Sequence, residues 1–232
     1  MHGVWSRFAI SFGIMMLMSP AALRGQKDDI SNDLKNIPKD VGEATQPTPP
    51  QTSAGTGVPQ RRTIEPAGTY INQSSGVQFP KRVGEFGRTS VELYDEEGRN
   101  VGGAYQKKIG GSIVNVMSVF SYPVAGRLAG SGTAAIFEAE KAAITSHQPN
   151  ARLIREEPYR AANGVPGDFA EYEINISVGK GKTVPVRSRI YLFADRGWLL
   201  KFRTTYPVAR AREGAAETEA FLRGFGTGVV RN

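Results

Sequence analysis

The side chains best suited to chemistry in this sequence are basic, and they crowd into one stretch near its C-terminal end. Between residues 183 and 212 lie seven basic residues and one acid, Asp195, a net charge of +6. They are Arg187, Arg189, Arg196, Lys201, Arg203, Arg210 and Arg212. Residues 76–232 hold 22 basic residues against 16 acidic ones, so this stretch carries a charge equal to their whole excess. Such a density of cations attracts phosphate head groups, acidic glycans or acidic proteins.

Side chains alternate between the two faces of a β-strand, and this periodicity predicts how the cations are arranged. Arg187 and Arg189 share a face of a strand expected over residues 183–193, and Lys201 and Arg203 share a face of the next, over residues 198–206. Because the two strands form a hairpin, we expect the four side chains to lie side by side. We name these four residues the anion stripe. The alternative is a solvated sheet face whose arginine stems cover apolar surface.

Cysteine and histidine counts restrict the possible chemistry. The 232 residues include no cysteine and only two histidines, His2 and His147. This excludes disulfides, thiolate zinc sites, iron–sulfur clusters and a cysteine nucleophile. We expect His147 at the last turn of a helix, where an imidazolium interacts favourably with the helix dipole. The sequence predicts no catalytic residue, no metal site and no cofactor.

Two short strings resemble ligand loops but have the wrong spacing. Gly179–Thr183 ends like a phosphate-binding loop, yet Ile176 stands where that motif requires its first glycine. Asp95–Glu97 are consecutive acids, whereas a calcium loop places its ligands at alternate positions. We interpret both strings as hairpin turns.

Two other classes of function stay open. An envelope hydrolase could use tyrosine or paired carboxylates instead of histidine, the candidate acids being Glu156, Glu157, Asp168 and Glu171. A small-ligand-binding module could enclose a pocket between sheet and helix lined by Tyr172, Trp198 and Phe221. Core packing is the commoner fate of such aromatic side chains.

The N-terminal residues have the layout of a secretory signal peptide. Arg7 is followed by the apolar run Phe8–Met18 and then by Ser19-Pro20-Ala21. A membrane anchor would need roughly 20 apolar residues, and this run is shorter. We therefore predict a signal peptide over residues 1–22, no transmembrane segment after its cleavage, and a periplasmic or secreted protein. An exported protein rarely meets nucleic acid, so we exclude nucleic acid as a partner.

Composition divides the remaining chain into two parts. Residues 23–75 lack hydrophobic periodicity, and residues 46–60 are mainly Pro, Gly, Thr and Gln. So few apolar side chains cannot offset the entropy lost on ordering the chain. We predict a disordered tether over residues 23–75 and a globular domain over residues 76–232.

Residues 76–232 alternate between strand and helix patterns. Strands rich in β-branched and aromatic residues are predicted over 88–94, 101–108, 112–122, 152–159, 169–178, 183–193 and 198–206. Helices are predicted over 131–148 and 209–225, the second burying Ala216, Ala220, Phe221, Leu222 and Phe225. Short turns between neighbouring strands require antiparallel pairing. The fold class is therefore α+β: a single antiparallel sheet flanked by two helices, in the order β-β-β-α-β-β-β-β-α.

Three strings in these hairpins resemble a known family. They are Tyr94–Tyr105 (YDEEGRNVGGAY), Val116–Pro123 (VMSVFSYP) and Lys201–Pro207 (KFRTTYP). In this order they are similar to the PsbP-like fold, which small secreted bacterial proteins of unassigned role share with an extrinsic photosystem II protein. The resemblance covers roughly residues 76–228, and it implies an antiparallel sheet between helices and a non-enzymatic assembly or binding role.

Together these features predict a secreted, non-enzymatic binding or assembly-support domain. It would engage an anionic lipid, an acidic glycan or an acidic partner protein through the anion stripe, Arg187, Arg189, Lys201 and Arg203.

Overall fold

The structure is a computed structural model that describes residues 61–124, 132–177 and 183–226. The predicted signal peptide and most of the predicted tether lie outside the described residues. So does most of the Gly179–Thr183 turn, of which only Thr183 is described.

Eleven strands and two α-helices make up the described chain. The first strands are short: β1 (Arg62–Ile64), β2 (Tyr70–Ile71), β3 (Gln78–Phe79) and β4 (Arg82–Val83). Then come β5 (Phe86–Leu93), β6 (Val101–Ile109), β7 (Ser112–Pro123) and α2 (Gly132–His147). The second half has β8 (Arg152–Arg160), β9 (Pro166–Ser177), β10 (Thr183–Asp195), β11 (Trp198–Pro207), the 3-10 turn η4 (Val208–Arg210) and α3 (Ala211–Phe225).

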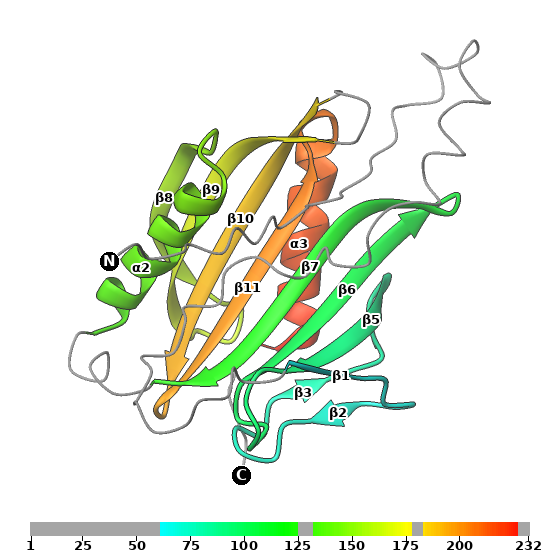
Figure 1. The fold of residues 1–232 in the computed structure, drawn as a ribbon. Coiled ribbons are helices and arrows are strands. Elements are labelled where there is room, and N and C mark those ends of the chain that lie inside the picture. The colour runs from blue at the N-terminus through cyan, green and yellow to red at the C-terminus, as the bar shows by residue number, and fades with distance from the viewer. Residues whose placement is uncertain (1–60, 125–131, 178–182, 227–232) are drawn as a thin grey trace, which may run out of the picture.

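Nine of the strands form one antiparallel sheet between the two helices (Figure 1). Its order is β1-β5-β6-β7-β11-β10-β9-β8, with β4 also paired to β5, while β2 and β3 form a separate two-stranded sheet. Two meanders of sequence-adjacent strands, β5–β7 and β8–β11, therefore meet where β7 pairs with β11. The predicted fold class, α+β with an antiparallel sheet and two helices, is confirmed, but the sheet has nine strands instead of seven.

Each face of the sheet carries its own apolar core. On the α3 face, Phe221 and Phe225 of α3 pack edge-on against Tyr105 and Phe202 of the sheet. On the α2 face, helix residues such as Ile136 and Ile144 pack with Ile190 and Leu192. Figure 1 shows α2 in front of β9 and β10, and α3 behind the middle of the sheet. Burying each of these large side chains contributes roughly 1.5–3 kcal/mol.

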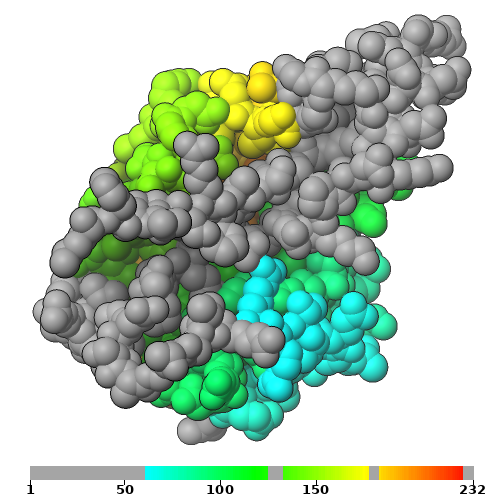
Figure 2. Space-filling view, viewed as in Figure 1, coloured from blue at the N-terminus to red at the C-terminus, as the bar shows by residue number. Residues whose placement is uncertain are grey.

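The N-terminal boundary of the domain differs from the predicted one, because residues 61–75 belong to the fold. Strand β1 pairs with β5, and Thr63 Oγ1 donates a 2.8 Å hydrogen bond to Glu92. The Asn72 side chain accepts from the backbone N–H of Ser74, and Ser75 lies 3.0 Å from Ser121 Oγ. Side-chain hydrogen bonds hold this segment, and apolar content alone does not reveal them. The surface of β1–β3 and that of α2 lie on opposite sides of the view in Figure 2.

Helix α3 buries a face slightly different from the predicted one. Phe221 and Leu222 are buried as expected, but Ala216 and Ala220 are exposed. Gly214 and Thr218 are buried in their place. A β-carbon at Gly214 would lie 2.4 Å from the Tyr206 ring, so glycine lets the helix approach the sheet closely here. Within the described ranges, no helix is both long and apolar enough to span a bilayer.

Candidate functional site

The structure divides the anion stripe between the two faces of the sheet. In the β10–β11 hairpin, Arg187 lies opposite Tyr206 and Arg189 opposite Thr204, whereas Arg203 lies opposite Ile190. Directly opposite residues of an antiparallel pair point to the same side. Arg187 and Arg189 therefore point to the α3 face, and Lys201 and Arg203 to the α2 face. The prediction that all four lie side by side is wrong.

Lys201 is a buried core residue. Its Nζ lies 2.9 Å from Glu140 Oε2 of α2, and its side chain is 2% exposed. The second Glu140 oxygen accepts a 2.7 Å hydrogen bond from the Tyr122 hydroxyl. Burial lowers the pKa of Lys201, although the Glu140 carboxylate opposes that shift. Lys201 thus holds α2 against the sheet and does not present a charge to solvent.

Arg203 is only partly exposed on the same face. Its Nε donates a 3.2 Å hydrogen bond to Ser188 Oγ. Burial lowers the pKa of Arg203 to about 10, with Glu140 and Tyr172 opposing the shift. This guanidinium belongs to the contact between the sheet and α2.

On the α3 face, Arg187 and Arg189 lie among carboxylates. Arg189 Nη2 is 3.3 Å from Glu171 Oε2, and Arg187 Nη2 is 3.2 Å from Glu173 Oε2. Arg155 of β8 lies opposite Glu171 in the register, and its side chain is 51% exposed. Three arginines, one from β8 and two from β10, therefore gather on this face, with the glutamates of β9 between the two strands.

These arginines retain donors that their carboxylate neighbours do not use. Arg187 Nη1, Arg189 Nε and the Tyr206 hydroxyl are buried and have no hydrogen-bond partner among the described residues. The Arg189 guanidinium lies 5.6 Å from the Phe169 ring centroid and 5.7 Å from that of Tyr206, between the two rings. Burial raises the pKa of Tyr206 to about 12, so its hydroxyl keeps its proton at neutral pH. We name Arg155, Arg187, Arg189 and Tyr206 the arginine cluster.

The arginine cluster adjoins a polar contact between the sheet and α3. Glu219 of α3 accepts hydrogen bonds from the hydroxyls of Tyr159, at 2.6 Å, and Tyr191, at 3.1 Å. Tyr191 in turn lies 3.5 Å from Arg189 Nη1. The position of Arg189 is thus linked to α3 through Tyr191.

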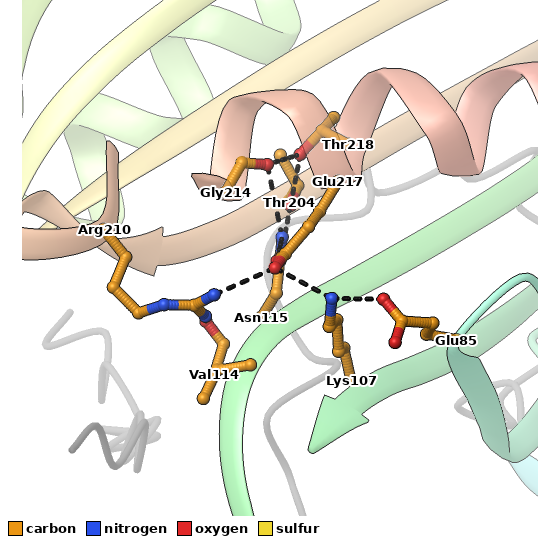
Figure 3. Close-up of polar contacts among 9 residues, drawn as sticks. All are labelled: Glu85, Lys107, Val114, Asn115, Thr204, Arg210, Gly214, Glu217 and Thr218. Atoms are coloured by element: carbon orange, nitrogen blue, oxygen red, sulfur yellow. Dashed lines mark hydrogen bonds and ion pairs between the residues drawn. The ribbon is translucent and has the colours of Figure 1, made fainter. Parts of the chain in front are cut away.

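A second polar network anchors the first half of α3 (Figure 3). Glu217 Oε1 lies 2.9 Å from both Lys107 Nζ and Arg210 Nη2, and Oε2 accepts from Asn115 at 3.2 Å. Lys107 also pairs with Glu85. The Asn115 side-chain oxygen accepts a 2.8 Å hydrogen bond from Thr204. All these groups satisfy one another, so the network serves to fix α3 on β6, β7 and β11.

A groove of about 660 Å³ lies over β1, β5, β6 and β7. Its lining contains hydroxyl, amide, charged and aromatic side chains from these four strands and from the adjoining Arg61, Glu65 and Tyr94. The sequence carries no local signal of the groove, because its lining is spread over residues 61 to 120 and contains no clustered charge.

The four acids predicted as candidates for a hydrolase site do not come together in the structure. Glu156 and Asp168 share the α2 face, where Glu156 accepts 2.7 Å hydrogen bonds from Lys141. Burial raises the pKa of Asp168, and the nearby Glu156 adds to that shift. Glu171 lies on the α3 face with Arg189, and the exposed Glu157 lies 3.6 Å from Arg155. The four acids do not form one site.

The aromatic side chains predicted to line a small-ligand pocket also lie on different faces of the sheet. Tyr172 belongs to the α2-side core, whereas Phe221 is in the α3-side core and Trp198 packs against it.

The exposed His147 has its Nδ1 2.9 Å from the carbonyl of Ala143. No group of three or more His, Asp or Glu residues in the described ranges could hold a metal ion.

Comparison with known proteins gives similarities to solved structures alone, since neither a family model nor a curated protein matches the chain. A Pseudomonas aeruginosa protein of unknown function has a TM-score of 0.43 at 11% identity, covering 62% of this chain and 92% of that one. The cyanobacterial PsbP of Synechocystis sp. PCC 6803 (CyanoP) has a TM-score of 0.37 at 14% identity, covering 75% of this chain and 96% of that one. A PsbP protein is thus among the structures that this chain is similar to.

Proposed function

We propose that this chain is a non-enzymatic binding domain that acts outside the cytoplasm and engages an acidic partner protein through the arginine cluster. One observation supports this most directly. The cluster holds three buried polar atoms without a partner, on Arg187, Arg189 and Tyr206. Leaving a buried donor unsatisfied costs about 1–3 kcal/mol. A carboxylate from a partner would supply the missing acceptors.

Partial exposure makes the arginines of the cluster accessible to a carboxylate from a partner. The side chains of Arg155 and Arg187 are 51% and 19% exposed, so an acid can reach the cluster from solvent and small side-chain shifts would engage the deeper donors. Arginine also binds carboxylates with two parallel hydrogen bonds, which adds specificity to charge attraction.

The mixture of charges favours a protein over a lipid surface. Glu157, Glu171 and Glu173 each pair with one of the three arginines, and an anionic membrane would be repelled by these acids. A partner protein can place single carboxylates beside each arginine and avoid these acids. Arginine and tyrosine are also enriched among residues that dominate protein interfaces.

A binding assay with an acidic peptide tests this proposal. The probe is a fluorescein-labelled peptide rich in Asp and Glu, titrated with the full chain at low and at physiological salt. We expect the double variant Arg155→Gln with Arg187→Gln to lose at least tenfold in affinity, since even one hydrogen bond to a charged group is worth about 1.5–3 kcal/mol. Binding of the wild type should also weaken as salt rises.

The matched control removes the same charge elsewhere. Arg82 and Arg99 are exposed residues of β4 and of the β5–β6 turn, and the double variant Arg82→Gln with Arg99→Gln should bind like the wild type. Equal losses in both double variants would mean that net charge alone drives binding. Tighter binding to phosphatidylglycerol vesicles than to the peptide would replace the protein partner by a membrane.

A further inference from the structure

The α2 side of the sheet is only half covered by a described helix. Helix α2 packs on β9 and β10, and its Glu140 reaches Lys201 of β11. The groove of about 660 Å³ occupies the other half, over β1, β5, β6 and β7. Cavities of roughly 300–1,000 Å³ are the usual size of small-ligand sites. This groove is on the opposite face from the arginine cluster and is independent of the function proposed above.

Small residues make up the floor of the groove. Ser90, Ala104 and Ser118 are direct cross-strand neighbours on β5, β6 and β7. Gly102 lies beside this row, and a β-carbon there would come within 3.0 Å of Tyr94 and 3.1 Å of Phe120. Glycine therefore lets these two rings close over the strand, and they form an apolar wall at one end of the groove.

The charges that line the groove cancel one another. Arg61 and Lys108 are balanced by Glu65 and Glu92. Arg61 Nε lies 3.0 Å from Glu92 Oε2, and Thr63 donates to the same oxygen. An ionic ligand would have to compete with this pair, so the lining favours a ligand without net charge.

The remaining polar groups are side-chain hydroxyls and an amide. Thr89, Ser90, Gln106 and Ser118 line the groove, and each can both donate and accept hydrogen bonds. The backbone groups of the floor are used in the sheet ladder, so a peptide would find no backbone partners here. A saccharide needs none, because its hydroxyls donate and accept and its apolar ring face can contact the wall of Tyr94 and Phe120.

We infer that this groove binds a neutral saccharide chain. The charge balance, the hydroxyl-rich floor and the aromatic wall each match one property of such a ligand. The inference adds a second binding site to the domain, with a ligand of a different class from the acidic partner of the arginine cluster.

Titration of the ¹⁵N-labelled chain with cellotetraose, chitotetraose and maltotetraose tests this inference. We expect at least one of these probes to shift the amide signals of Ser90, Gly102 and Ala104 in a saturable manner. Ala104→Phe fills the floor of the groove and should weaken that binding at least tenfold. The control Ala142→Phe makes the same change at an exposed position of α2 and should bind like the wild type.

A milder variant covers the case in which Ala104→Phe perturbs folding. Gln106→Ala removes one amide from the groove and should weaken binding several-fold while the spectrum stays dispersed. The inference is overturned if none of the three probes shifts these amides, or if Ala104→Phe and Gln106→Ala both bind like the wild type. Tighter binding of tetragalacturonate than of the neutral probes would overturn the assignment of a neutral ligand.

Discussion

At the scale of single residues, the basic side chains of this domain divide into structural and available ones. Lys201 is sequestered by Glu140, and Arg203 lies in the contact beneath α2. Arg155 and Arg187 remain at the surface of the other face. Composition and local charge density do not distinguish these four basic residues. Their burial depends on which other elements pack over them, and the local sequence does not show that. The partner of Lys201 comes from a helix 61 positions away in sequence.

The ion pair of Lys201 and Glu140 gives a prediction about stability. Lys201→Met leaves the Glu140 carboxylate buried with only the Tyr122 hydroxyl among its described hydrogen bonds. Breaking a buried pair by removing one partner costs about 3–5 kcal/mol of unfolding free energy. Adding Glu140→Gln removes the stranded charge and keeps an acceptor for Tyr122, so the double variant should regain part of that loss. Urea unfolding measures both, and a double variant no more stable than the single one would contradict the prediction.

At the scale of elements, the hairpin turn determines which cations share a face. Asp195 pairs with Trp198, so the turn has two residues, Arg196 and Gly197, both with positive φ. This is the backbone of the commonest tight hairpin. In that register, residues of β10 and β11 share a face only when one number is odd and the other even. Arg187 and Arg203 are both odd, so the turn length already implied that they point to opposite faces.

Strand and helix positions could be predicted well from the sequence, whereas the sites could not. The β-branched alternation of β9 and the proline at the end of β11 predict the positions of these strands to within a few residues. The arginine cluster depends on Arg155 and Tyr206, which only the sheet register brings beside Arg187. The groove depends on which half of a sheet face α2 leaves open, a matter of helix packing with no local sequence signal.

The network that anchors α3 predicts a dependence of stability on pH. Burial tends to raise the pKa of Glu217, but hydrogen bonds from Lys107, Asn115 and Arg210 outweigh it and lower the pKa below its ordinary value. The folded protein therefore binds this proton less readily than the unfolded chain. The resulting stability is present at neutral pH and is lost as pH falls below about 4.3, through the folded-state pKa.

Glu217→Gln tests that dependence. The variant should lose about 1–3 kcal/mol of unfolding free energy at pH 7, because Lys107 and Arg210 lose a charged acceptor. The difference from wild type should shrink between pH 5 and pH 3, where the wild-type carboxyl becomes protonated. Glu213→Gln, at an exposed position in the first turn of the same helix, is the control. A difference that stays constant from pH 7 to pH 3 would contradict the role of ionised Glu217.

At the scale of the whole molecule, the domain begins before the composition changes. Residues 61–75 contribute β1, the Asn72 turn and, through Ser75, the acceptor of a hydrogen bond from Ser121 of the sheet. Ile64 and Tyr70 also pack against the α3-side core. The segment looks like a linker by composition because polar contacts, which have no hydrophobic period, hold much of it.

Truncation measures where the domain begins. A chain starting at residue 76 should be less stable than one starting at residue 61 by about 3 kcal/mol or more. It loses the packing of Ile64 and Tyr70 and leaves the buried Glu92 without Arg61 and Thr63. Urea unfolding of the two chains gives the difference directly. Equal stabilities of the two chains would contradict this prediction and place the N-terminal boundary of the domain at residue 76.

The outer edge of the sheet at β8 shows features that discourage pairing with another chain. Pro158 stands within the strand, its register shifts near Ile154, and the strand carries five charged side chains of both signs: Arg152, Arg155, Glu156, Glu157 and Arg160. Prolines, bulges and charges are the usual means by which edge strands avoid aggregation. The exposed Leu153 and Ile154 are therefore flanked by residues that oppose strand addition.

The order of the strands also has a kinetic consequence. Within each meander, β5–β7 and β8–β11, every pairing joins neighbours in sequence, so the loops that close on forming these contacts are short. The β7–β11 seam, the β1–β5 pair, the packing of α3 and the Lys201–Glu140 contact unite distant segments. We therefore expect the two meanders to assemble quickly and independently, and the docking of β7 on β11 to limit the folding rate. During synthesis, which proceeds from the N-terminus, the first meander could form before the second has been made.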